Sequence, residues 1–114
     1  MTGAGATANH SPVLLAEVLA HLAPRDGGVY VDATFGAGGY ARAILDAADC
    51  AVVGIDRDPE ACARAADLAL SYGGRLRILR GAFGGMVRLL ADIEISAVDG
   101  VTFDLGVSSP QRCV

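Results

Sequence analysis

Residues 29–40, VYVDATFGAGGY, decide the fold that we expect for this chain. The β-branched and aromatic side chains of residues 29–31 indicate a strand buried on both faces, which Asp32 ends with a carboxylate. The loop that follows contains three glycines, Gly36, Gly38 and Gly39. Glycine lets a backbone turn sharply and approach a bound molecule. Because helix formers continue from Ala41, we expect a ligand-binding loop at a helix N-terminus, above the carboxyl end of the strand.

The rest of the sequence alternates strands with helices. Apolar runs predict further strands at residues 51–56, 76–80 and 97–105. Helical patterns are present at residues 12–24, 41–48, 59–70 and 86–90. Asp58 is suited to cap the third of these helices, and Pro59 to begin it. The alternation favours a Rossmann-like α/β fold, in which helices flank a parallel sheet.

Length and composition limit the chain to one domain at most. Its 114 residues suffice for a single core but are few for a complete doubly wound enzyme. Hydrophobic residues make up 53%, with a mean hydropathy of +0.43, which suggests faces covered by further chain or by a partner. No apolar run approaches a membrane span, and residues 1–9 lack the features of a signal peptide. We therefore expect a cytoplasmic protein, no membrane partner and a flexible tail over residues 1–9.

The net charge argues against a strong nucleic-acid-binding surface, and the cysteines argue against a metal site. With a net charge of −4 and a pI of about 4.9, the chain has little electrostatic attraction for the phosphate backbone of a nucleic acid. Three arginines, Arg75, Arg77 and Arg80, form a cluster more typical of a solvated strand face than of an RNA contact. The three cysteines form no C-x-x-C pair, so no metal site is expected and the thiols fit a reducing compartment. Cys50 and Cys62 are expected to be packing residues.

Functional side chains are expected to meet at the carboxyl ends of the strands. Asp32 and the glycine loop follow the first strand, Asp56 ends the second, and Asp104 lies near the end of the fourth. Asp56 lies 20 residues after Gly36, the spacing at which an acidic residue accepts both hydroxyls of an adenosine ribose. Phe83, after the third strand, is placed either to contact an adenine ring or to join the core.

The residue types narrow the choice of cofactor. The pattern Gly36-x-Gly38-x-x-Ala41 fits the dinucleotide fingerprint, so an NAD-binding oxidoreductase fragment is one alternative. Asp32 would repel a pyrophosphate at the loop, however, and would attract the ammonium of a methionine moiety. No Gly-Lys-Ser/Thr follows the glycines, which excludes a Walker-type loop. S-adenosyl-L-methionine fits best, and a non-catalytic binding or assembly module is the remaining alternative.

Four motifs give the chain a specific resemblance. They are HSPVLL at residues 10–15, DATFGAGGY at 32–40, IDRDP at 55–59 and DLGVSSPQ at 104–111. In these motifs the chain resembles the bacterial 16S ribosomal RNA cytosine-N4 methyltransferase family. The resemblance implies a class I methyltransferase fold that binds S-adenosyl-L-methionine. It also implies methylation of the exocyclic N4 amine of a cytidine in small-subunit ribosomal RNA.

The resemblance also assigns residues to the site. The family's cofactor contacts fall on Gly38, Gly39, Tyr40, Asp56, Phe83, Asp104 and Gln111. Tyr40 stands where a histidine is often found in the family. Asp32 and Gly36 complete the expected cofactor site. Asp104 is also the expected catalytic residue, and Ser108 and Ser109 offer hydroxyls to a target base unstacked into the site.

The end of the chain departs from the family pattern. Family members continue into more strands and an inserted helical region that handles RNA, whereas residues 112–114 do not follow them. Residues 10–114 are therefore expected to form a partial methyltransferase domain, truncated after about the fourth strand, whose activity alone is in question. Losing the neighbour of the fourth strand would leave an open apolar edge, at which self-association is expected.

Overall fold

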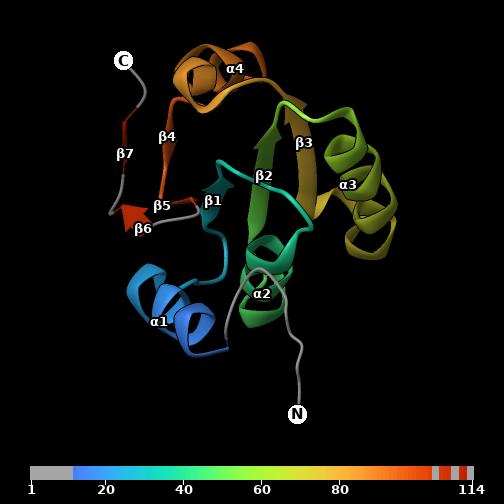
Figure 1. Cartoon of the computed structure of the whole chain (residues 1–114). Coiled ribbons are helices and arrows are strands. Elements are labelled where there is room, and N and C mark those ends of the chain that lie inside the picture. Colours follow the sequence, from blue (N-terminus) through green and yellow to red (C-terminus); the bar gives the residue numbers. More distant parts are fainter. Residues whose placement is uncertain (1–11, 104–105, 109–110, 113–114) are drawn as a thin grey trace.

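The computed structural model describes residues 12–103, 106–108 and 111–112, with side chains over residues 15–103. Helices and strands alternate along most of the chain (Figure 1). The helices are α1 (Pro12–Leu22), α2 (Gly39–Ala47), α3 (Pro59–Tyr72) and α4 (Met86–Asp92). The strands are β1 (Val29–Asp32), β2 (Ala51–Asp56), β3 (Leu76–Arg80), β4 (Ala97–Val98), β5 (Gly100–Phe103), β6 (Gly106–Ser108) and β7 (Gln111–Arg112). Two short 3₁₀ turns, Gly73–Arg75 and Phe83–Gly85, precede β3 and α4.

The main sheet has the strand order β3-β2-β1-β5-β6. Strand β1 lies parallel to both β2 and β5, and β2 lies parallel to β3. The predicted parallel sheet with flanking helices is therefore confirmed. Strand β3 is at one edge, as its alternating apolar and basic residues predicted. The carboxyl ends of these four strands meet at one edge of the sheet, where the glycine loop crosses from β1 to α2.

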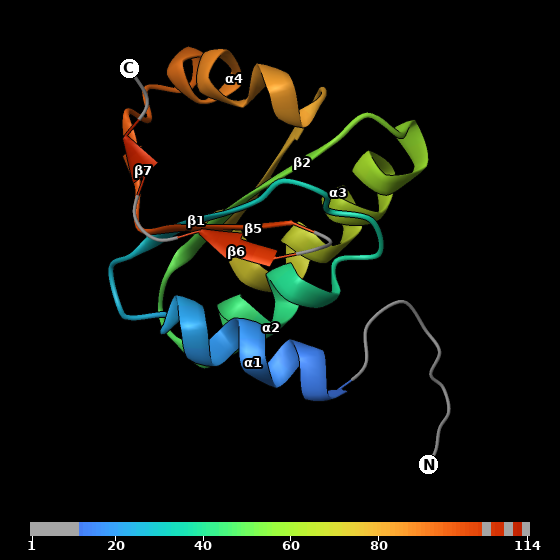
Figure 2. The same ribbon diagram turned by 60° about the vertical axis from the view of Figure 1, so that its left-hand side comes forward.

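Apolar side chains fill both faces of the sheet. Tyr30 and Val52 pack with helices α1, α2 and α3 on one face, whereas Val31 and Val53 pack with α4 on the other. Figure 2 shows α4 on the opposite side of the sheet from α1 and α2. Neighbouring residues of a strand thus belong to different cores, because successive side chains point to opposite faces. This is why β1 and β2 are almost continuously apolar.

The local signals at the start of α3 are confirmed. The Asp58 carboxylate accepts a hydrogen bond from the backbone N–H of Glu60 at 2.9 Å, and Pro59 is the first helical residue. An acidic cap satisfies an N–H that has no partner within the helix. In the part of the chain that the structure describes, no helix combines the length and the apolar character needed to cross a membrane.

Two expectations at the end of the sheet are wrong. The single strand predicted over residues 97–105 is divided, because β5 pairs with β1 whereas β4 pairs antiparallel with β7. The outer edge of β5, predicted to be open, is occupied by β6, which pairs antiparallel with it. Strand β6 thus pairs with backbone groups along the outer edge of β5. The edge strands of the sheet are β3 and β6, and self-association through an edge stays a prediction.

Candidate functional site

The glycine loop is held to the sheet by backbone hydrogen bonds that continue the ladders of the strands. The N–H of Ala33 donates to the carbonyl of Thr102 on β5 at 2.8 Å. The N–H of Phe35 donates to the carbonyl of Ile55 on β2 at 3.0 Å. Asp32 is fully buried, and its Oδ1 accepts from the N–H of Thr34 at 3.3 Å. Asp32 thus helps to organise the loop, and its contact with a cofactor stays a prediction.

Glycine is required in this loop by both backbone conformation and packing. Gly36 and Gly38 have φ values of +54° and +87°, in the left-handed region that L side chains rarely adopt. A Cβ at Gly38 would also lie 2.9 Å from the ring of Phe35 and 3.2 Å from Leu68. Gly39 is the first residue of α2. The loop therefore delivers the backbone to a helix N-terminus, as the sequence predicted.

Asp56 connects the ends of β2 and the glycine loop. Its Oδ2 accepts a hydrogen bond from the N–H of Gly36 at 2.8 Å, and its Oδ1 accepts from the N–H of Asp58 at 2.9 Å. Its backbone carbonyl accepts from the N–H of Gly81, after β3, at 2.9 Å. One residue thus fixes three loops at the carboxyl edge of the sheet. A carboxylate has about four lone-pair sites, so two remain for a ligand.

A hollow of about 200 Å³ opens beside Asp56. Its lining residues, which define the Asp56–Phe83 hollow, are Ala33, Thr34, Asp56, Arg57, Gly81, Ala82 and Phe83. The Phe83 side chain is 49% exposed, and its ring centroid lies 5.7 Å from that of Phe103 on β5. Phe83 is therefore a surface aromatic at the mouth of a hollow and not a core residue. Of the two readings that the sequence left open, burial in the core is therefore wrong, and contact with an adenine ring stays a prediction.

Other predicted site residues lie away from this hollow or outside the described residues. The Tyr40 ring is 2% exposed and belongs to the core between α1, α2 and the sheet. Its contact with a cofactor stays a prediction. Asp104 and Ser109 lie outside the described residues. Ser108 and Gln111 are described only as backbone, in β6 and β7.

Three residues that shape this region were not singled out from the sequence. Arg57 lines the hollow, and Arg64 on α3 donates from Nη2 to the carbonyl of Gly36 at 3.3 Å. Gly54 lies within β2, where a Cβ would be 2.5 Å from the Phe35 ring. An isolated glycine inside an apolar strand signals a close approach, so Gly54 could have been found. No local pattern marks Arg64, because its partner is 28 residues away.

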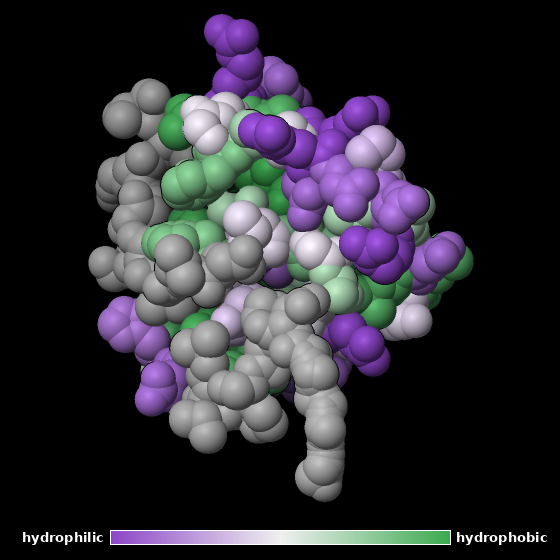
Figure 3. All heavy atoms as spheres, viewed as in Figure 1, coloured by the Kyte–Doolittle hydropathy of each residue, from purple (hydrophilic) through white to green (hydrophobic). Residues whose placement is uncertain are grey.

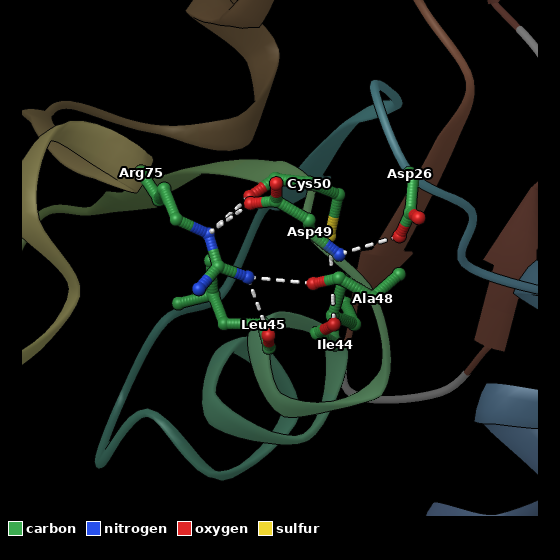
Figure 4. Close-up of polar contacts among 7 residues, drawn as sticks. All are labelled: Asp26, Ile44, Leu45, Ala48, Asp49, Cys50 and Arg75. Carbon is green, nitrogen blue, oxygen red and sulfur yellow. Dashed lines mark hydrogen bonds and ion pairs between the residues drawn. The ribbon is translucent and has the colours of Figure 1, made fainter.

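The cysteines in this part of the chain are packing groups. Cys50 is buried, its Sγ lies 3.5 Å from the carbonyl of Ile44, and burial raises the pKa of its thiol (Figure 4). A raised pKa keeps the thiol protonated and unreactive. Cys62 is half-buried, with Sγ 3.7 Å from the Asp56 carbonyl. Within residues 12–103, 106–108 and 111–112, no three acidic, cysteine or histidine side chains gather in a way that could hold a metal ion.

The outer surface is unevenly polar. In the view of Figure 3, hydrophobic residues gather below α4, whereas the surface over α3 is mainly hydrophilic. Val87 on α4 is 42% exposed, and Phe83 precedes the same helix. Part of the high apolar fraction of the sequence therefore lies at the surface, at Phe83 and Val87 among others.

In sequence, the chain is similar to known methyltransferases. A model of the MraW methylase family matches residues 7–112. The ribosomal RNA small subunit methyltransferase H of Parvibaculum lavamentivorans is 57% identical over 109 residues, which cover 96% of this chain and 32% of the relative. The protein of the same name from Zymomonas mobilis is 50% identical over 111 residues, covering 97% and 33%. The chain spans about a third of the length of the curated relatives it matches.

Solved structures share the fold. TrmN from Thermus thermophilus has a TM-score of 0.62 at 25% identity, covering 84% of this chain and 28% of TrmN. The C-terminal domain of precorrin-6Y C5,15-methyltransferase from Rhodobacter capsulatus has a TM-score of 0.62 at 22% identity, covering 78% and 46%. Geranyl diphosphate methyltransferase, solved with S-adenosylmethionine, has a TM-score of 0.56 at 23% identity, covering 61% and 29%. The predicted class I methyltransferase fold is confirmed.

Proposed function

Because the chain belongs to the MraW methylase family, we propose that it binds S-adenosyl-L-methionine and forms the cofactor-binding part of a ribosomal RNA methyltransferase. The proposed reaction transfers a methyl group to the exocyclic N4 amine of a cytidine in small-subunit ribosomal RNA. The observation that carries the proposal is the Asp56–Phe83 hollow, which lies next to a glycine loop at the carboxyl edge of the sheet. Ligands of open α/β folds bind at this edge.

The described residues fit the adenosine end of this cofactor. The two free lone-pair positions of Asp56 suit vicinal ribose hydroxyls, which are donors. The exposed ring of Phe83, backed by Phe103, offers a flat apolar surface to an adenine. Both residues line the same hollow. The hollow therefore suits an adenosine group through both hydrogen bonds to the ribose and apolar contact with the adenine.

The charges around the glycine loop favour a methionine moiety over a pyrophosphate. Asp32 places a carboxylate at the loop, which would repel a phosphate. A methionine moiety carries an ammonium and a carboxylate, and Arg64 adds one positive charge beside Gly36. The loop can therefore balance both charges of an amino acid. This argues against the NAD-binding alternative.

The transfer step assigns roles to residues near the end of the chain. When bound, the cofactor supplies a methyl group on a sulfonium centre. The lone pair of cytosine N4 is delocalised into the ring, so the amine must be oriented and must lose a proton as the new bond forms. We assign Asp104 to contact with the cofactor or the amine, and Gln111 to the cofactor. Ser108 and Ser109 are assigned to the unstacked base.

The proposed partner is small-subunit ribosomal RNA, and the proposed location is the cytoplasm. A net charge of −4 provides little attraction for a phosphate backbone, so most contacts with RNA are assigned to residues beyond this chain. The names of the relatives support an RNA substrate. Self-association through strand β3 or β6 is a further proposal, tested by sedimentation of the purified chain.

Isothermal titration calorimetry of the 114-residue chain with S-adenosyl-L-methionine, and separately with NAD, tests the cofactor. We expect binding of the first ligand only. Phe83→Ala should weaken it about tenfold through lost stacking, whereas Val87→Ala, a truncation of another exposed apolar residue, should not. Binding of NAD, or failure of the folded chain to bind S-adenosyl-L-methionine, would contradict the proposal.

The position of methylation needs a separate test. Small ribosomal subunits lacking the modification are incubated with S-adenosyl-L-methionine and the full-length protein that carries these residues. Mass spectrometry of the RNA nucleosides should then detect N4-methylcytidine, and an Asp104→Ala protein should produce much less. Methylation of another base or atom would remove the N4 assignment while leaving the cofactor site intact.

A further inference from the structure

The peptide groups on both sides of Gly36 are held by side chains from different elements. On one side, the Gly36 N–H donates to Asp56 Oδ2 at the end of β2, at 2.8 Å. On the other side, the Gly36 carbonyl accepts from Arg64 Nη2 on α3, at 3.3 Å. Gly36 itself has a φ of +54°. The two contacts hold the peptide groups before and after Gly36, and together they restrict the φ and ψ angles of this glycine.

These contacts determine the orientation of the next backbone N–H. A trans peptide is planar, and its carbonyl and its N–H point in opposite directions. All the described peptides are trans. Fixing the Gly36 carbonyl toward Arg64 therefore directs the Ala37 N–H to the other side of the loop. Without Arg64, glycine could adopt several conformations at similar energy, and this peptide could rotate.

Arg64 is well placed for this task because its helix is firmly docked. Its neighbour Ala65, together with Ala61, is buried against the sheet, and Asp58 caps the helix start. The Arg64 side chain itself is exposed. Its contribution to global stability should therefore be small, whereas its effect on the loop should be direct.

We infer that Arg64 is a positioning residue, which orients the peptide between Gly36 and Ala37 for the methionine end of the cofactor. The inference rests on the proposed function for the identity of the ligand. Its structural part, the ordering of the loop by Arg64, is independent of that identity. A loop that is ordered less of the time binds its ligand correspondingly more weakly.

The test combines backbone amide exchange with ligand titration on the 114-residue chain. Exchange at Gly36 and Ala37 is measured by NMR without ligand, and the affinity for S-adenosyl-L-methionine by calorimetry. Arg64→Ala should raise the exchange rates and weaken binding, each by about fivefold, as expected for one lost hydrogen bond. Arg64→Lys, which retains a charged donor, should restore part of both. Arg88→Ala, at another exposed arginine, is the matched control.

The outcomes separate the two proposals. Unchanged exchange in Arg64→Ala would overturn the positioning role, whatever the affinity. Faster exchange with unchanged affinity would overturn the link to the cofactor. Faster exchange in a chain whose wild type binds no S-adenosyl-L-methionine would support loop ordering but overturn the proposed function. The thermal midpoint should be nearly the same in all variants, which excludes unfolding as the cause.

Discussion

At the scale of the residue, Gly54 explains how the glycine loop reaches its position. The Phe35 ring crosses directly over β2 at this residue, where any Cβ would be 2.5 Å from the ring and 3.1 Å from Ile78. Phe35 is buried in the core that contacts α2 and α3. The missing side chain of Gly54 thus allows Phe35 to anchor the glycine loop to the sheet.

Gly54→Ala should therefore disturb stability and the loop together. Overpacking of a filled core costs about 1–3 kcal/mol, and moving Phe35 would also shift the residues next to it. Chemical denaturation and calorimetry with S-adenosyl-L-methionine should show lower stability and weaker binding. Gly74→Ala, where an added Cβ meets nothing within 4 Å, should change neither. A Gly54→Ala chain as stable as wild type would disprove the close approach.

At the scale of the element, α2 depends on an arginine from outside it. Arg75 Nη2 donates to the carbonyls of Leu45 and Ala48 at the end of α2, and its Nε donates to the Cys50 carbonyl at 2.9 Å (Figure 4). Carbonyls at a helix C-terminus have no partner within the helix and attract positive charge. Arg75 was expected on a solvated strand face, so its structural role is a correction.

Arg75→Ala should lower the free energy of unfolding by about 2–3 kcal/mol, because it removes charged hydrogen bonds to three carbonyls. Arg77→Ala, an exposed arginine of the next strand, should stay within about 0.5 kcal/mol of wild type. Urea denaturation of wild type and both variants measures these free energies of unfolding. Equal stability of the two would show that water replaces Arg75 at the helix end.

At the scale of the whole molecule, Asp99 links parts of the chain that are far apart in sequence. Its Oδ2 accepts from the Val29 N–H at the start of β1, and its Oδ1 accepts from Arg25 Nη2, both at 2.8 Å. The Val29 N–H and then the Arg25 guanidinium lower the pKa of Asp99. The residue also separates β4 from β5, which is why the predicted single strand is divided.

The lowered pKa makes part of the stability depend on pH. Above the usual carboxyl pKa of about 3.9 the ionised Asp99 stabilises the folded chain, and this contribution is lost as pH falls through the lower folded-state pKa. Asp99→Asn should therefore reduce stability at neutral pH, by less than about 1 kcal/mol, because Arg25 is exposed and solvent screens its charge. Denaturation from pH 7 to pH 2 should show the two chains converging in acid. A difference independent of pH would contradict the role of charge.

The sequence by itself determined the features that depend on neighbouring residues. Signals of this kind are the apolar runs of β1 and β2, the glycines after Asp32 and the cap of α3 by Asp58, which all act within a few residues. These local signals were enough to predict the fold class and to place the glycine loop at the carboxyl edge of the sheet. The motifs added the family, which the comparisons confirm.

Only the tertiary structure decided which side chains meet. The hold of Asp56 and Arg64 on Gly36, the approach of Phe35 to Gly54 and the binding of Arg75 to the end of α2 join residues from different elements. The antiparallel pairing of β6 with β5 likewise joins two separate elements. A periodic pattern gives the face on which a side chain lies, but a contact between elements also depends on how they pack, and no local pattern contains that information.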